Sequence, residues 1–465
     1  NKIIMRVKLL HKKNKGLIAL ATIASLFMSC DKKKGQDNTN NNESQKIVGY
    51  VYTSTNGEGG NQIIKLARYS DGTLGQEKVY ETGGKGGSDS SAPVNGDYDS
   101  QGAIQIIDNH LLAANTGDNT VTVFDLDKKT GELKKNIVVS SHGERPVSIS
   151  YTKSNQEPNI YWVAVANQWG IPTALYDGNK YVELPSKDFF KQDLKKEDPS
   201  DKNRNISLYK FNAKTGELIF TKLLDTYKRY WGGPVQVIFN HAGDQLALTT
   251  WGIPHFLTEN PDPKFVKPSQ VIIYDFKEGE PSNKRVFEEE GLIGAVGFNW
   301  SKKDNLLYVT YFNPIKEKDN QGLVVLEVTS DKINKISSHE TGASADVDEA
   351  CWTAISPDYK RFYAVSFGTN VITPYDLDET GKIVKTLSYT GVNNKGHDPD
   401  LKDMYISSDS KYAYCLGSFQ TFTIKYFSIT DNGLKYSGEY NVETTKAYQG
   451  KTGKFNFQGF VGYDL

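Results

Sequence analysis

Three residues of this sequence carry side chains that together could hydrolyse an ester: Arg145, Glu349 and His397. A carboxylate or an imidazole can take a proton from water, and an arginine can bind a substrate carboxylate or a developing oxyanion. The three residues are far apart in the sequence, and each one alone is a weak signal. The chemistry therefore depends on whether repeated structural elements bring them around one opening.

Other polar and aromatic residues occur close to the same short apolar runs and could contact a ligand. They are Gln101, His142, Trp231, Asp346, Asp348, Asp398, Asp400 and Gln458. A structural role is the alternative, because aspartates form turns readily and Arg145 could pair with a nearby acid to hold the loops together. No calcium-loop spacing, cysteine cluster, P-loop, G-x-S-x-G or H-E-x-x-H motif occurs, so we expect no metal and no cofactor.

Short strands separated by turns are the elements that must position these residues. In the stretch 350–377, three runs of aromatic and β-branched residues are divided by the turn-forming segments 356–360 and 368–370. A closing hairpin recurs as "DLDKKTGELKK" at 125–135, "KFNAKTGELIF" at 210–220 and "DLDETGKIVK" at 376–385. Units of four short strands, about forty residues long, are typical of the blades of a propeller.

Counting such units predicts an all-β, seven-bladed β-propeller over residues 47–465. The N-terminal segment offers only three strands, at 47–54, 62–68 and 77–81, and the tail 455–465 can supply the fourth. The C-terminal strand would then join the N-terminal blade and remove the exposed edges of an open sheet. An insertion at 168–205 in the third blade is expected to form binding surface or a lid.

Aligning the first strands of these units on their closing turns gives equivalent positions at one end of the central channel. They are Gln101, Arg145, Gly233, Gly294, Glu349 and Asp400, with Gln458 near the seventh. A cation, two carboxylates and two amides would therefore lie around a common opening.

The N-terminus has the pattern of an export signal. Lysines precede an apolar stretch at 17–28 that is too short to span a membrane comfortably, and Ser29-Cys30 follows. The pattern resembles a bacterial lipoprotein signal, so we expect a signal peptide at 1–29, lipid attachment at Cys30 and a flexible tether at 30–46. An ordinary secretory signal is the alternative. Either way, the expected location is the bacterial cell envelope, with the anchor on the outer membrane or facing the periplasm.

Composition narrows the class of partner. The net charge is −1, with 27 Tyr, 21 Phe and only 3 Met, so no basic surface for nucleic acid is indicated. Cys351 and Cys415 are expected to be buried free thiols. We expect a monomeric propeller.

Several segments carry a family resemblance, among them "YVYTSTN", "LLAANTGDNTVTVFDLD", "HGERPVSIS" and "HDPDLKDMYISSDSKYAYCLGS". They resemble the lactonase-like seven-bladed propellers, which include 6-phosphogluconolactonase-type enzymes and the fungal carboxymuconate-lactonizing enzyme. One departure is Arg145-Pro146-Val147-Ser148, where a Pro-His pair is common in the phosphogluconolactonase-like branch. The resemblance implies binding, and hydrolysis, of a small polar or anionic lactone at the channel mouth. The alternative is a non-catalytic propeller that docks another cell-envelope protein or glycan.

Overall fold

The computed structural model describes residues 45–87, 100–168, 199–228, 232–253, 267–315, 321–342, 348–392, 399–443 and 456–465, with the backbone of 176–177 and 180–181. All the described residues belong to one compact unit, Gln45–Leu465. The expected signal peptide, Cys30 and most of the tether lie outside the described residues.

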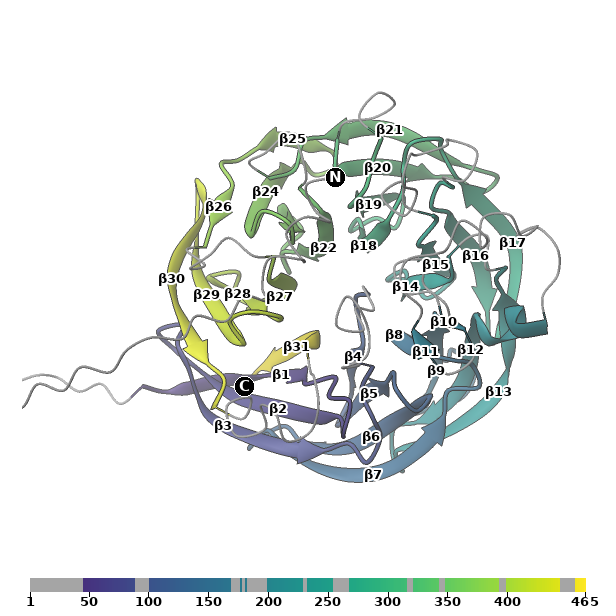
Figure 1. Ribbon diagram of the computed structural model, residues 1–465, viewed down its shortest axis with the longest axis horizontal. Helices are drawn as coiled ribbons and strands as arrows, with labels where there is room; N and C mark the ends of the chain where they lie inside the picture. Colours follow the sequence, from purple (N-terminus) through teal and green to yellow (C-terminus); the bar gives the residue numbers. More distant parts are fainter. Residues whose placement is uncertain are drawn as a thin grey trace, which may run out of the picture. The chain divides into compact units, whose positions relative to one another are not determined.

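Seven antiparallel sheets surround a central axis (Figure 1). Blade 1 contains β1 (Ile47–Ser54), β2 (Gln62–Tyr69), β3 (Leu74–Glu81) and β31 (Gln458–Asp464), and blade 2 contains β4 (Ile104–Ile107), β5 (His110–Asn115), β6 (Thr120–Asp127) and β7 (Glu132–Ser140). Blade 3 contains β8 (Pro146–Lys153), β9 (Ile160–Asn167), β12 (Asn205–Asn212) and β13 (Glu217–Thr226), and blade 4 contains β14 (Pro234–Phe239), β15 (Gln245–Thr250), β16 (Val271–Lys277) and β17 (Glu280–Phe287).

The other three blades repeat this order of strands. Blade 5 contains β18 (Ala295–Trp300), β19 (Leu306–Tyr311), β20 (Leu323–Val328) and β21 (Ile333–His339). Blade 6 contains β22 (Ala350–Ile355), β23 (Arg361–Ser366), β24 (Val371–Leu377), β25 (Ile383–Thr386) and β26 (Thr390–Gly391). Blade 7 contains β27 (Leu401–Ile406), β28 (Tyr412–Gly417), β29 (Thr423–Thr430) and β30 (Gly433–Asn441). The predicted seven-bladed propeller is confirmed.

The C-terminal strand closes the ring, as the sequence predicts. β31 pairs antiparallel with β1, with Tyr50 opposite Tyr463 and Tyr52 opposite Val461. β31 is thus the innermost strand of blade 1, beside β27 of blade 7 and β4 of blade 2 in Figure 1. Every inner strand therefore has a neighbouring blade on each side.

Burial patterns explain why these segments form a closed ring. Middle strands such as β2 and β19 are buried along almost their whole length, because neighbouring blades cover both of their faces. Outer strands such as β3 and β7 alternate between more buried and exposed residues, because one of their faces meets water. The sequence therefore shows the period of two most clearly in the outermost strands.

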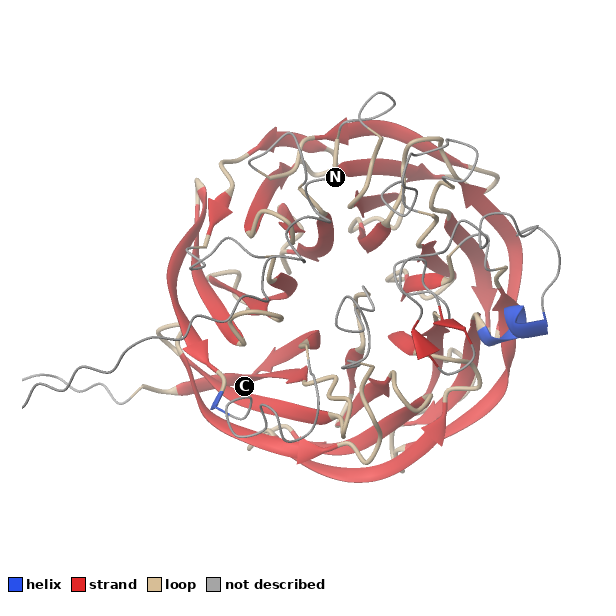
Figure 2. Cartoon of the chain, viewed as in Figure 1, coloured by secondary structure: helices blue, strands red, loops and turns tan. Residues whose placement is uncertain are grey.

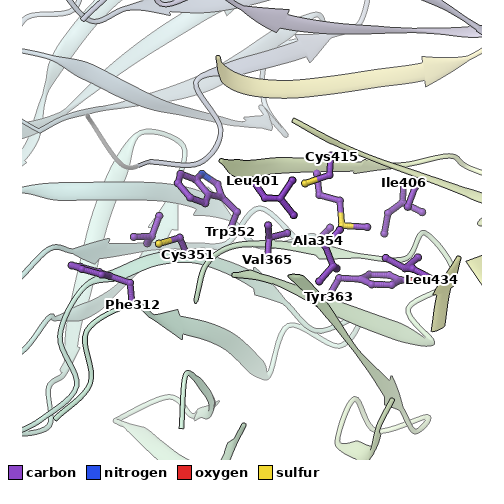
Figure 3. Packing of buried hydrophobic residues seen from close by; sticks show 14 of the residues in the cluster. Phe312, Cys351, Trp352, Ala354, Tyr363, Val365, Leu401, Ile406, Cys415 and Leu434 are labelled. Carbon is purple, nitrogen blue, oxygen red and sulfur yellow. The ribbon is translucent and has the colours of Figure 1, made fainter. Parts of the chain in front are cut away.

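Apolar side chains fill the spaces between blades. Among the described residues, six clusters of buried residues each join two neighbouring blades. A seventh lies between blades 6 and 7 and extends along the inner part of blades 3, 4 and 5. Figure 3 shows the cluster between blades 6 and 7, in which Trp352 and Val365 face Leu401 and Cys415. Cys351 and Cys415 are both buried and free, which confirms the expectation for the thiols.

Little of the described chain is helical. Figure 2 shows a ring built of strands, with the 3-10 helix η1 (Pro199–Asn203) beside β13. The insertion predicted at 168–205 contributes η1 and a short hairpin of β10 (Tyr176–Asp177) and β11 (Lys180–Tyr181). The rest of the insertion lies outside the described residues, so its expected role as a lid stays a prediction.

Candidate functional site

One position recurs at the start of the innermost strand in blades 3 to 7. Its carbonyl accepts a hydrogen bond from the amide of the residue that follows the second strand, at 2.9 to 3.1 Å. The five residues, called the start positions below, are Arg145, Gly233, Gly294, Glu349 and Asp400. The alignment made from the sequence is therefore confirmed for these five blades, and it places the residues at the same end of the central channel.

Four of the start positions have left-handed backbones. Gly233 and Gly294 have φ of 77° and 74°, while Arg145 and Glu349 have φ of 61° and 51°. This conformation destabilises a residue with a β-carbon by about 1 kcal/mol or more, whereas glycine adopts it freely. The two glycines also leave no room for a side chain, because a β-carbon on Gly294 would lie 1.8 Å from the Phe312 ring. Blades 3 and 6 instead keep a charged side chain at this position.

Arg145 and Glu349 are both half-buried. The backbone amide of Arg145 donates to Asn119 Oδ1 at 2.8 Å, which fixes the loop of blade 3 against blade 2. The carbonyl of Glu349 accepts from the Phe367 amide at 2.9 Å. Backbone contacts of this kind hold both α-carbons in place, so the two side chains extend from rigid points.

Gln101 and Gln458 are held in hydrogen bonds within the channel. Gln101 comes just before blade 2, yet its Nε2 donates to Thr353 O at 2.8 Å and its Oε1 accepts from Thr353 N at 2.9 Å, in blade 6. Gln458 Nε2 donates to Ser100 Oγ at 2.7 Å, and Trp352 Nε1 donates to Ser100 O at 2.7 Å. Since blades 2 and 6 are not neighbours, these bonds join blade 6 to the segment that leads into blade 2 from across the ring. Both glutamines therefore have structural bonds.

Asp348 and Asp400 stabilise turns at the same end of the channel. Asp400 is fully buried, and its Oδ1 accepts from the amides of Phe419 and Gln420 at 2.8 Å each, while Thr421 Oγ1 donates to its Oδ2 at 2.6 Å. Asp348 accepts from Ser366 Oγ at 2.8 Å and Thr369 Oγ1 at 2.9 Å, and burial raises its pKa. These bonds follow the turn-forming role that the sequence left open for aspartates.

His142 lies away from the other predicted residues. Its ring stacks on Phe220 of β13, with centroids 3.7 Å apart and planes at 17°, and its side chain is exposed. Because β13 is the outermost strand of blade 3, the contact places His142 toward the outer part of the blade. The structure therefore does not bring His142 together with Gln101 and Gln458.

Four predicted residues lie outside the described residues: Trp231, Asp346, His397 and Asp398. Their roles stay predictions. Among the parts of the chain that are described, no group of three or more His, Cys, Asp or Glu side chains is placed to hold a metal ion. In the same stretches, no helix is long and apolar enough to cross a bilayer.

Sequence reasoning missed Lys402. It stands two residues after the start position of blade 7, where blades 3 to 6 have Val147, Val235, Val296 and Cys351, all buried. Only 1% of Lys402 is exposed, and its Nζ lies 5.0 Å from the centre of the Trp352 ring and 4.5 Å from that of Phe419. Aromatic faces attract an ammonium group, which favours its burial here. A lysine among apolar residues in the aligned strands was the signal that could have identified it.

The residue that follows this position along the inner strand is a polar acceptor in blades 3, 4 and 7. Ser148 Oγ accepts from Val237 N at 3.2 Å, Gln236 Oε1 from Phe298 N at 2.7 Å, and Asp403 Oδ2 from Gly459 N at 3.1 Å. Each bond joins the inner strand of one blade to the inner strand of the next. An inner strand is an edge strand, so these acceptors satisfy amides that would otherwise be buried without a partner.

Burial of Asp403 raises its pKa to about 7. The carboxyl is 3% exposed and bonds to β31, so it belongs to ring closure. A buried carboxyl that titrates near neutral pH couples this closure to pH.

The described end of the channel therefore has a cation at Arg145, a carboxylate at Glu349 and a buried ammonium at Lys402. Arg145 and Glu349 could bind a polar anion and activate water, as the sequence suggested. Gln101, Gln458, Asp348 and Asp400 have the hydrogen bonds given above.

Comparisons with known proteins agree on the fold. No protein-family model matches the sequence, and no curated protein matches it. The chain is similar, with a TM-score of 0.57 and 11% identity over 91% of this chain and 99% of the other, to a protein from Bacteroides fragilis proposed to be a 6-phosphogluconolactonase. It is similar to the periplasmic gluconolactonase of Pseudomonas aeruginosa, with a TM-score of 0.58 and 12% identity over 88% and 99% of the two chains.

A protein from Lactobacillus plantarum gives a TM-score of 0.56 at 11% identity, covering 90% of this chain and 99% of that one. Identities this low show a shared architecture and leave the reaction open. The chain thus has the fold of the 6-phosphogluconolactonase-like seven-bladed propellers.

Proposed function

We propose that this propeller binds a small polar or anionic lactone at the end of the channel that carries the start positions, and hydrolyses it. Arg145 binds the carboxylate of the ligand or the oxyanion formed at its carbonyl carbon, and Glu349 takes a proton from the attacking water. The water oxygen bonds to that carbon, the ring C–O bond breaks, and the ring oxygen takes the proton from Glu349 to become a hydroxyl. The product is the open hydroxy acid.

One observation carries this proposal: Arg145 and Glu349 occupy a left-handed position that is glycine in blades 4 and 5. Their backbones make the same hydrogen bond as the glycines do, so this backbone bond forms whether the residue is a glycine or a charged residue. Unfavourable backbone conformations kept by bulky residues are concentrated at functional sites. The lactonase-like fold supports the class of ligand.

Replacement by glycine gives a sharp test. Arg145→Gly and Glu349→Gly remove the side chains and also relieve the backbone strain, which should offset lost side-chain contacts, so the free energy of unfolding should fall by less than about 1 kcal/mol. Hydrolysis of gluconolactone- and muconolactone-type substrates should fall at least 100-fold in kcat/KM for each variant. Lactone opening measured by pH-stat, alongside urea unfolding, would record both effects.

A different result would reverse the assignment. If both variants lose more than about 1 kcal/mol of stability, the two side chains hold the loops together as structural residues. If the parent protein turns over none of these lactones and binds none of them by calorimetry, the proposed function is wrong. Retention of a cell-envelope protein or glycan by that inactive protein would then favour a docking role.

We also propose that the propeller is attached to the cell envelope through a lipid on Cys30, which rests on the sequence pattern around that residue. The polar segment that follows would give the propeller reach from the membrane surface. Incorporation of radiolabelled palmitate in the bacterial host should occur with the parent protein and be lost in Cys30→Ser. Equal labelling of both proteins would refute the anchor.

A further inference from the structure

A second cluster of reactive side chains lies at the opposite end of the propeller. Strands in a blade are antiparallel, so the turns between the first and second strands lie at the other end from the start positions. In blades 4, 5 and 6 these turns have the same hydrogen bond: Gly243 N to Asn240 O, Asp304 N to Ser301 O, and Tyr359 N to Ser356 O, at 3.1, 3.0 and 2.8 Å.

The fourth residue of each turn is left-handed. Gly243, Asp304 and Tyr359 have φ of 74°, 56° and 59°. Glycine and aspartate are common in this conformation, whereas an aromatic residue is unusual there. Tyr359 is thus the least favoured choice of the three for the local backbone.

Side chains from these three turns form one hydrogen-bonded chain. Asp304 Oδ1 pairs with His241 Nδ1, and His241 Nε2 pairs with the Tyr359 hydroxyl. Asp304 also accepts from the backbone amides of His241 and Ala242, at 3.1 and 3.0 Å. Blades 4, 5 and 6 therefore each supply one member.

The chain of bonds fixes the roles of the imidazole nitrogens. Asp304 is a carboxylate and can only accept, so Nδ1 carries a hydrogen and donates to it. In the neutral ring Nε2 is then the acceptor, and the Tyr359 hydroxyl donates to it. A hydroxyl facing a histidine that a carboxylate orients is the arrangement by which hydroxyl nucleophiles are activated on unrelated folds.

Reagents can reach this cluster from solvent. The His241 side chain is 44% exposed and that of Asp304 is 16% exposed. Tyr359 is half-buried, and its ring meets His241 edge to face, with centroids 5.2 Å apart. The hydroxyl is therefore held in place at the surface.

We propose that Asp304, His241 and Tyr359 form a second reactive site, in which the Tyr359 hydroxyl accepts acyl groups from small activated esters. The phenolic oxygen bonds to the acyl carbon as its proton passes to His241 Nε2, and Asp304 stabilises the imidazolium through Nδ1–H. The C–O bond to the leaving group then breaks, and the leaving oxygen takes the proton from His241. The products are O-acyl-Tyr359 and a free alcohol or phenol, so atoms and charge balance.

General-base help is required at this site. Burial, together with the nearby charge of Asp304, raises the pKa of Tyr359. Free phenolate is therefore scarce at neutral pH, and the proton must leave as the new bond forms. A tyrosine without such a base should react far more slowly.

The test uses 4-nitrophenyl acetate on the full chain at pH 7.5, with peptide mapping by mass spectrometry over time. Tyr359 should gain an acetyl group at least 10-fold faster than Tyr389, a tyrosine that is 49% exposed. The comparison is internal to the unmodified protein, so it stands even if a variant fails to fold. Equal rates at the two tyrosines would overturn the proposal.

Variants then separate the roles. Tyr359→Phe should abolish acetylation at this position. His241→Gln should lower the rate of acetylation at Tyr359 to the rate at Tyr389. Tyr389→Phe should leave the rate of acetylation at Tyr359 unchanged. Folding is checked by circular dichroism. If His241→Gln folds and Tyr359 still reacts at the parent rate, His241 is not the base and the proposal fails. Arg145→Gly should keep this reaction, which distinguishes it from the proposed lactone site.

Discussion

The guanidinium of Arg68 in β2 pairs with the carboxylate of Asp464 in β31, a residue 396 positions further along the chain. The Arg68 side chain is only 2% exposed, and Asp464 also accepts from the Ser408 amide in blade 7 at 3.1 Å. The last strand thus joins blade 1 to blade 7 through a charge as well as through its backbone. Ring closure should depend strongly on this pair.

Asp464→Asn should destabilise the protein by about 3 kcal/mol, because it leaves the buried Arg68 charge without a counterion. Urea unfolding followed by fluorescence would measure this. Lys411→Ala is the control, since the Lys411–Asp409 pair is exposed and its loss should cost less than about 1 kcal/mol. Equal effects of the two changes would contradict the role of Arg68 in closure.

Gln101→Ala should cost about 1–3 kcal/mol, because it leaves the buried Thr353 amide and carbonyl without their partners across the ring. Gln156→Ala, in an exposed turn, should change stability by less than about 0.5 kcal/mol. Thermal unfolding of both variants provides the comparison. A Gln101 variant as stable as the Gln156 control would show that the crossing bonds contribute little.

Asp403 should make the protein less stable as the pH rises toward 7. Its pKa is raised from 3.8 to about 7 by burial, so the folded state holds the proton more tightly than the unfolded state does. The contribution of Asp403 to the free energy of unfolding is fully present below about pH 4. It is lost as the pH rises through 7, and the total loss is a few kcal/mol. Asp403→Asn should remove this loss while its amide oxygen still accepts from Gly459.

The measurement for Asp403 is the free energy of unfolding at pH 5 and pH 8. Asp403→Asn should be more stable than the parent at pH 8, and the difference should be clearly smaller at pH 5. Asp409→Asn is an opposite control, because hydrogen bonds from Ser407 and Lys411 hold the pKa of Asp409 below its usual value despite partial burial. That group stabilises the fold above its unfolded pKa of about 3.8, so its loss should be felt equally at pH 5 and pH 8. Identical pH profiles for the parent and Asp403→Asn would refute the coupling.

Cys351 and Cys415 should be unreactive toward a thiol reagent such as dithionitrobenzoate in the native protein. Both are buried, and burial raises the pKa of the Cys415 thiol, which disfavours the reactive thiolate. Both should react at once in denaturant. Rapid native labelling at either residue would show that the space between blades 6 and 7 opens readily.

The architecture was readable from the sequence because each blade repeats a local pattern. Turn-forming residues such as those at 356–360 and the recurring hairpins mark the limits of the strands, and alternation in the outer strands identifies the faces. The missing strand of blade 1 could be assigned to the tail because closure removes an exposed edge, and β31 does pair with β1. The start positions were also correctly aligned, because the first strand is six residues long in each of blades 4 to 7 and eight residues long in blade 3.

The sequence by itself determined the number of blades, their closure and the level in the channel at which Arg145 and Glu349 lie. Only the tertiary structure decided which polar side chains already have bonds: Gln101 reaches Thr353 across the ring, and Asp400 holds a turn of its own blade. The reason is physical, since strands follow from the local periodicity of a chain, whereas a hydrogen-bond partner depends on which edges closure brings together. His241, Asp304 and Tyr359 show the same limit, because their turns meet only once three blades are packed side by side.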